Sequence, residues 1–197
     1  MKFNSAVILA GGKSSRMGFD KQLIRINQQR VIDIIISKLN KEFKEVIIVT
    51  NKPKYYKNYE NVLTDEIKKK GPLSGIHIGL KKAKSEYVYF TACDMPNVNT
   101  SYIRYMKEKI REIKVDACVT NYKDWIEPFN SFYNKGLITS IEQRLRNDER
   151  SIYTFLKNRD CFFIEEEEAR KFSPTWDMFL NLNTKGDLQK YIRENRG

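Results

Sequence analysis

The sequence predicts an α/β protein, an open three-layer α/β/α sandwich with helices on both faces of a mainly parallel sheet. Short apolar runs rich in branched and aromatic residues alternate along the chain with segments of helical periodicity. That alternation is typical of parallel sheets, because parallel neighbours need a long crossover that is usually a helix. Ligands of such sheets bind at the carboxyl ends of the strands. We therefore expect the functional residues in the loops that follow the strands.

The clearest strands are expected over residues 6–9, 46–49, 87–90 and 117–120, with a weaker one at 61–64. Helical periodicity connects them over residues 31–43, 73–83 and 102–113. Beyond residue 121 the pattern loosens into a strand at 126–133, helical segments at 137–145 and 152–156, an apolar run at 161–164 and a closing helix at 188–193, for which Thr184 is the expected N-cap. No repeat or linker interrupts the series, so we expect a single domain over residues 1–197.

Composition excludes several classes of protein. Hydrophobic residues make up 41% of the 197, enough to build a core. No apolar stretch approaches the roughly 20 residues that span a bilayer, and the N-terminus has no signal-peptide core, so we expect a cytoplasmic protein without membrane association. Three scattered cysteines and a single histidine argue against a disulfide framework, a multi-histidine metal site and a His-based triad.

The net charge of +11 raises the question of nucleic acid binding. The basic residues are spread along the chain, and no zinc-finger, RNA-recognition or helix-turn-helix motif accompanies them. A small phosphorylated ligand explains a basic protein equally well, so nucleic acid is not an expected partner.

The first glycine-rich loop, over residues 9–21, directly follows the first strand and reads LAGGKSSRMGFDK. Its small residues would let backbone N–H groups approach phosphate oxygens, and Arg16 and Lys21 add positive charge. A bare double glycine would indicate only a tight turn, but three glycines, two hydroxyls and the cations Arg16 and Lys21 favour phosphate binding. The spacing matches neither G-x-x-x-x-G-K-[ST] nor G-x-G-x-x-G, which argues against a P-loop triphosphatase and a dinucleotide-binding dehydrogenase.

A carboxylate follows the strand at 87–90, in the sequence Cys93-Asp94-Met95-Pro96. Asp94 is placed to hold Mg²⁺ against a triphosphate, because Mg²⁺ favours one or two carboxylates together with substrate phosphates. Taken alone, an ordinary turn aspartate is an equally good interpretation. The phosphate loop beside it favours the metal site.

A third group of residues comprises Asp65 and the segment from Gly71 to Gly75. Pro72 suits the first turn of a helix, and Gly75 would allow that helix to approach a flat ligand or the first loop closely. His77 lies in the same apolar helix and is expected to be a packed core residue. The three thiols are likewise interpreted as small buried hydrophobes.

Together these motifs resemble the molybdenum cofactor guanylyltransferases, a family with the Rossmann-like fold of the nucleotide-diphospho-sugar transferases. The similarity runs from the first loop through Asp65, residues 71–75 and Cys93-Asp94-Met95-Pro96 to Glu127-Pro128 and Asn181-Leu182-Asn183-Thr184, in the order of the family and over nearly the full length. The first motif is shared by many nucleotidyltransferases, whereas its combination with the later ones is more specific.

The resemblance implies a nucleotidyltransferase that moves GMP from MgGTP to the phosphate of molybdenum-molybdopterin, giving molybdopterin guanine dinucleotide and pyrophosphate. GTP and molybdenum-molybdopterin are the implied partners, Mg²⁺ is the implied cofactor, and cofactor-inserting proteins or molybdoenzyme chaperones are further candidates. By the same resemblance, the catalytic residues are Asp94, Arg16 and Lys21, the metal ligand is Asp94, the nucleotide-binding residues are Leu9, Ala10, Gly11, Gly12, Lys21, Asp65, Gly75 and Asp94, and the pterin-binding residues are Asn181 and Asn183.

Two alternatives remain at this point. One is a related nucleotidyltransferase that uses CTP or acts on a sugar phosphate, and the other is a non-catalytic nucleotide- or RNA-binding module. Gly11 and Met95 stand where cytidylyltransferase relatives usually carry alanine and glutamine, which favours guanine. The last motif continues Lys185-Gly186-Asp187-Leu188 where the family has Pro-Glu-Asp-Leu, so the pterin-side helix is expected to start more loosely.

Overall fold

The computed structural model describes residues 1–11, 20–67 and 70–194. The strands in this part of the chain are β1 (Ser5–Ala10), β2 (Arg25–Ile26), β3 (Gln29–Arg30), β4 (Glu45–Thr50), β5 (Val62–Leu63), β6 (Tyr87–Ala92), β7 (Ala117–Tyr122), β8 (Trp125–Asn134) and β9 (Cys161–Ile164). The α-helices are α1 (Val31–Leu39), α2 (Pro72–Lys82), α3 (Thr100–Lys109), α4 (Ile138–Arg146), α5 (Ile152–Leu156), α6 (Glu166–Arg170) and α7 (Lys185–Glu194). Four short 3₁₀ helices are described as well: η1 (Lys21–Leu23), η2 (Pro53–Tyr56), η3 (Lys135–Leu137) and η4 (Asp177–Phe179).

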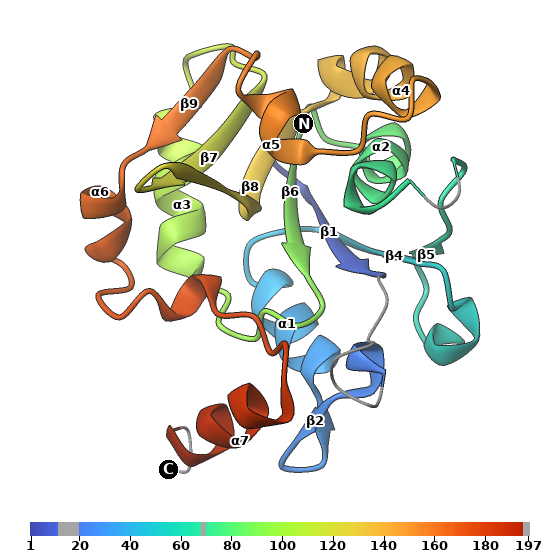
Figure 1. Cartoon of the computed structure of the whole chain (residues 1–197), viewed down its shortest axis with the longest axis vertical. Coiled ribbons are helices and arrows are strands. Elements are labelled where there is room, and N and C mark those ends of the chain that lie inside the picture. The colour runs from blue at the N-terminus through green and yellow to red at the C-terminus, as the bar shows by residue number, and fades with distance from the viewer. Residues whose placement is uncertain (12–19, 68–69, 195–197) are drawn as a thin grey trace.

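One sheet organises the described residues, with strand order β5-β4-β1-β6-β8-β7-β9 (Figure 1). β1 is parallel to β4 and β6, β4 is parallel to β5, and β7 is parallel to β9. The predicted mainly parallel α/β architecture is confirmed. β2 and β3 form a separate antiparallel hairpin. Figure 1 shows β1 and β6 pointing toward the end of the molecule that carries β2 and α7, so the carboxyl ends of these strands face that end.

Helices cover both faces of the sheet because β1 is apolar on both sides. Ala6 and Ile8 belong to a buried cluster with α1 and α3, whereas Val7 and Leu9 belong to a second cluster with α2, α4 and α5. Side chains alternate between the faces of a strand, so one short apolar strand contributes to two cores. This arrangement of helices on both faces of the sheet confirms the predicted three-layer sandwich.

The pairing of β8 is the main departure from a purely parallel sheet. β8 runs antiparallel to both β6 and β7. Only two residues connect β7 to β8, and Lys123 in that turn has a positive φ of 54°. Such a short connection can join only antiparallel strands.

Other differences concern the ends of elements. The helix expected over 102–113 is α3, which begins at Thr100 because the Asn99 side chain accepts a hydrogen bond from the Tyr102 N–H at 2.9 Å. α7 begins at Lys185, and the Asp187 N–H donates to Thr184 Oγ1 at 3.1 Å, which confirms the predicted cap. His77 is 1% exposed, as expected of a packed core residue.

Candidate active site

The candidate active site lies where β1, β4 and β6 end side by side. The Cys93 N–H donates to the Leu9 carbonyl at 3.1 Å, which ties the loop after β6 to the end of β1. The Leu182 N–H donates to the Asp94 carbonyl at 2.9 Å, so the late polar segment also reaches this edge. These backbone contacts bring three distant parts of the chain together.

Three predicted site residues meet in one junction. The Lys21 ammonium lies 2.9 Å from Asp94 Oδ2 and also donates to Asn183 Oδ1. The side chains of Lys21 and Asp94 are 23% and 11% exposed, so the ion pair is partly shielded yet open to a ligand. We call this group the Lys21–Asp94–Asn183 junction. It joins the end of the first loop, the second residue after β6 and the segment before α7.

A second ion pair supports the same loop, and the sequence analysis did not identify it. Asp20 accepts from Lys52 and from the Gln22 N–H, the latter at 3.2 Å, which makes Asp20 the N-cap of η1. The hydrogen bond from Lys52 to Asp20 raises the pKa of Lys52. An aspartate before a short helix is a recognisable cap signal, but nothing in the sequence pairs it with Lys52.

The predicted nucleotide-binding residues lie in several different environments. A Cβ atom at Gly75 would lie 2.8 Å from Leu9 Cδ2, so any larger residue there would require the Leu9 side chain to shift where α2 packs on the end of β1. Among the residues that the structure describes, none has an atom within 4 Å of a Cβ placed on Gly11, which leaves open space beside that backbone. Burial raises the pKa of Asp65, which follows β5. The predicted site residues Gly12 and Arg16 lie outside the described residues.

The two asparagines that were predicted to bind the pterin, Asn181 and Asn183, differ in their contacts. Asn183 is part of the Lys21–Asp94–Asn183 junction, whereas the Asn181 amide donates to the Phe179 carbonyl at 3.1 Å within its own segment. Asp187 Oδ2 accepts from the N–H groups of Asn183 and Thr184 at 3.0 and 2.8 Å. The start of α7 therefore holds the backbone that presents Asn183.

A buried asparagine that the sequence analysis missed connects the end of β6 to the C-terminal segment. Asn130 Oδ1 accepts from the hydroxyls of Tyr89 and Thr91 at 3.0 and 2.9 Å, and its amide donates to the Met178 carbonyl. Asn130 has a positive φ of 54°, a conformation that asparagine adopts more readily than most residues. In the Glu127-Pro128 motif just before Asn130, burial raises the pKa of Glu127, although a hydrogen bond from Trp176 acts to lower it.

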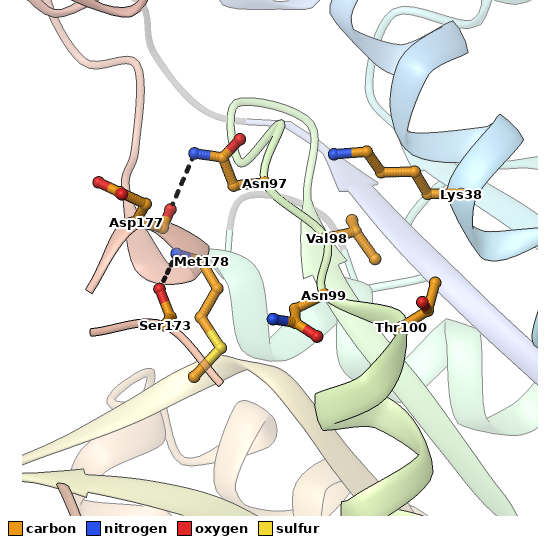
Figure 2. A pocket seen from close by; sticks show the side chains of 8 residues that line it. All are labelled: Lys38, Asn97, Val98, Asn99, Thr100, Ser173, Asp177 and Met178. Carbon is orange, nitrogen blue, oxygen red and sulfur yellow. Dashed lines mark hydrogen bonds between the residues drawn. The ribbon is translucent and has the colours of Figure 1, made fainter. Parts of the chain in front are cut away.

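A cavity of about 360 Å³ lies beside this connection, between α1, the start of α3 and η4 (Figure 2). Lys38 at its rim donates to the Pro96 carbonyl at 3.0 Å, and burial lowers the pKa of Lys38. The Asn97 amide donates to the Asp177 carbonyl at 3.2 Å, and the Met178 N–H donates to Ser173 Oγ at 3.2 Å. The polar groups of the cavity thus bind one another and hold the loop after Asp94 in place.

The donor set at the junction fits a metal ion that arrives with its substrate. Within residues 1–11, 20–67 and 70–194, no three His, Cys, Asp or Glu side chains are grouped so as to hold a metal ion by themselves. Asp94 could supply one carboxylate oxygen, and Mg²⁺ commonly completes such a shell with phosphate oxygens and water.

Among residues 1–11, 20–67 and 70–194, no helix is both long and apolar enough to cross a membrane.

Comparisons with known proteins agree with this architecture. Residues 6–162 match the model of the MobA-like NTP transferase domain. A protein from Syntrophotalea carbinolica named "Molybdenum cofactor guanylyltransferase" is 50% identical over 198 residues, covering 100% of this chain and 94% of its own. A relative from Peptoclostridium acidaminophilum named "Probable molybdenum cofactor guanylyltransferase" is 52% identical in an alignment that covers 96% of this chain and 88% of the relative's own length.

The fold has a solved counterpart. The crystal structure of molybdopterin-guanine dinucleotide biosynthesis protein A from Archaeoglobus fulgidus superposes with a TM-score of 0.84 at 24% identity and covers 98% of both chains. That likeness establishes the fold, and the sequence relatives establish the family. The chain belongs to the molybdenum cofactor guanylyltransferase family, among the MobA-like NTP transferase domains.

Proposed function

We propose that this protein transfers GMP from MgGTP to the phosphate of molybdenum-molybdopterin, with release of pyrophosphate and formation of molybdopterin guanine dinucleotide. The observation that carries the proposal is the Lys21–Asp94–Asn183 junction, in which the candidate phosphate loop, metal ligand and acceptor segment meet. The names of the relatives at 50% and 52% identity support the choice of reaction.

The chemistry requires positioning and charge stabilisation more than proton transfer. In transfers of this type the protein aligns the two phosphates and compensates the charge that develops on them. The acceptor phosphate is largely ionised near neutral pH, so no general base is needed. In this proposal Lys21, which contacts Asp94 and Asn183, would compensate charge where the donor and acceptor phosphates meet.

The remaining residues have binding roles in this proposal. The backbone of Leu9, Ala10 and Gly11 would hold the nucleotide beside the open space at Gly11, and Asp65 the guanosine portion. Mg²⁺ held by Asp94 would neutralise triphosphate oxygens. Asn183 would contact the acceptor, and Asn181 would do so after release from Phe179. Gly12 and Arg16 would complete the phosphate loop.

The alternatives have less support. A CTP-dependent or sugar-phosphate enzyme has the same fold but not the family name of the relatives. A non-catalytic binding module would leave the junction without a role. We further propose one nucleotidyltransferase domain over residues 1–197, acting in the cytoplasm, with cofactor-inserting proteins or molybdoenzyme chaperones as recipients of the product.

The test is to incubate the protein separately with each of the four nucleoside triphosphates, Mg²⁺ and a carrier loaded with molybdenum-molybdopterin, and to measure pyrophosphate. We expect release with GTP only, dependent on both the loaded carrier and Mg²⁺. Release with CTP in place of GTP would contradict the guanine assignment. Steeply salt-dependent RNA binding without any release would favour the non-catalytic module.

A further inference from the structure

A second cavity, of about 620 Å³, lies away from the junction, between the β2–β3 hairpin, the first turn of α1 and the residues of η2 and just beyond it. Its lining includes the four cations Arg25, Arg30, Lys54 and Lys57 but only one carboxylate, Asp33. We call it the basic cavity. Its volume lies within the roughly 300–1,000 Å³ typical of small-molecule sites.

Arg30 fixes a positive charge in the wall of the basic cavity. Its Nη1 donates to the Tyr55 carbonyl at 2.9 Å and to the Tyr59 hydroxyl at 3.3 Å, and its Nη2 donates to the Gln22 carbonyl at 2.9 Å. The guanidinium also lies over the rings of Tyr56 and Tyr59, 5.1 and 5.6 Å from their centroids. All these acceptors are neutral, so none of them cancels the charge.

The single carboxylate is already engaged. Asp33 Oδ1 accepts from the Tyr59 hydroxyl at 2.6 Å. Burial and this hydrogen bond raise the pKa of Tyr59 to about 12, so the hydroxyl stays protonated and continues to donate. None of the ion pairs in the described chain joins Asp33 to a cation of the basic cavity. Three positive charges therefore remain in excess around it, four cations against one carboxylate.

The basic cavity is separate from the candidate nucleotide site. Gln22 is buried between them: its carbonyl accepts from Arg30, while its side chain accepts from the Thr50 hydroxyl at 2.8 Å, at the end of β4. A ligand in the basic cavity would therefore not occupy the Lys21–Asp94–Asn183 junction.

We propose that the basic cavity binds a small phosphate-bearing molecule, in addition to the substrates of the transfer reaction. Fixed arginines and mobile lysines are the side chains that recognise phosphate groups, through charge-assisted hydrogen bonds. Lys54 and Lys57 are exposed and can turn toward an anion, while Arg25 is exposed on the hairpin, where its Nη1 donates to the Gln28 carbonyl. This site also gives part of the net charge of +11 a function.

The experiment is a titration of the ¹⁵N-labelled full chain with inorganic pyrophosphate, in the presence of a chelator so that no metal complex forms at Asp94. Resonances of the Asn58 and Tyr59 amides and of the arginine Nε–H groups report on the basic cavity. We expect saturable shifts of these resonances. Replacing two exposed cations of the site, in the double variant Lys54→Gln/Lys57→Gln, is expected to weaken binding at least about tenfold.

The matched control is Lys41→Gln/Lys44→Gln, which removes the same charge from exposed lysines beyond the other end of α1. The affinity of this control variant for pyrophosphate should stay within about twofold of that of the unmodified protein. Equal weakening in both double variants would show a response to net charge alone and would overturn the proposal. Absence of saturable shifts around Asn58, or shifts confined to Gly11 and Asp94, would also overturn it. Because this titration measures no turnover, its outcome is independent of the pyrophosphate-release assay.

Discussion

The partners of Lys21 in the candidate site include Asp94, at 2.9 Å, and Asn183. Replacing it with alanine removes the cation at the point where the two phosphates would meet. We expect Lys21→Ala to lower kcat/KM for GTP by about 10²- to 10³-fold, the usual loss when a preorganised group that stabilises transition-state charge is removed. Steady-state pyrophosphate release measures this directly.

Lys44→Ala is the control for Lys21→Ala, because Lys44 is an exposed lysine between α1 and β4, away from the carboxyl edge of the sheet. Its kcat/KM should match that of the unmodified protein. If Lys21→Ala were as active as Lys44→Ala, Lys21 would have no part in the site.

The start of α7 is a compact capping arrangement that positions Asn183. The Thr184 hydroxyl accepts from the Asp187 N–H, while the Asp187 carboxylate accepts from the N–H groups of Asn183 and Thr184. Asp187→Ala should lower the free energy of unfolding by about 1 kcal/mol and raise KM for the acceptor. Thermal unfolding and acceptor titration measure the two effects.

Gly186→Ala, one residue earlier, is the matched comparison for Asp187→Ala. A Cβ there would lie 3.5 Å from Thr184 Oγ1, an ordinary contact, and α7 should gain up to about 1 kcal/mol of stability from alanine. A loss of acceptor affinity in Gly186→Ala equal to that in Asp187→Ala would mean that the carboxylate does not position Asn183.

Elements with strong apolar patterns could be predicted from the sequence, and weakly patterned ones could not. β1 and β6 are continuous buried runs, and α2 begins at a proline after glycine, so each has a clear local signal. β2 and β3 have two residues each and are joined by Asn27 and Gln28, both with positive φ, without a glycine to mark the turn. This hairpin, which forms one wall of the basic cavity, was therefore missed.

The spatial meeting of distant residues was predictable only in part. The strand order of an open α/β sheet brings strand ends together, so Asp94 was expected near the first loop. The hydrogen bond of Lys21 with Asn183 spans 162 residues, and that of Lys52 with Asp20 spans 32. No local pattern encodes such pairings, because they depend on how the C-terminal segment and the loop after β4 pack against the sheet.

His77 connects the stability of the fold to pH. Its imidazole on α2 is buried, with Nε2 3.7 Å from Glu142 on α4 and neither ring nitrogen hydrogen-bonded within the described structure. Burial lowers the pKa of His77 below its ordinary 6.5, more than Glu142 raises it. At pH values between the lowered pKa of His77 in the folded state and its ordinary pKa of 6.5 in the unfolded state, the unfolded chain binds more protons than the folded chain. Stability should therefore fall as pH decreases below about 6.5, by up to ~1.4 kcal/mol per pH unit.

Urea unfolding from about pH 7.5 to about pH 5.5 measures this dependence, with His77→Leu as the comparison, since leucine removes the titrating group from the same apolar helix. The variant should lose less stability than the unmodified protein over this interval. Parallel stability profiles for the two proteins would contradict the assignment to His77.

The proposed role of Asp94, as the ligand of a divalent ion beside the nucleotide, can be tested in a crystal. The experiment is a crystal of the protein soaked with Mn²⁺ and a non-hydrolysable GTP analogue, in which the anomalous signal of manganese locates the ion. We expect one manganese ion bound both by the Asp94 carboxylate and by triphosphate oxygens, next to Gly11, and we expect this ion to be lost in Asp94→Asn. A triphosphate and ion bound away from Asp94, or an unchanged ion in Asp94→Asn, would contradict it.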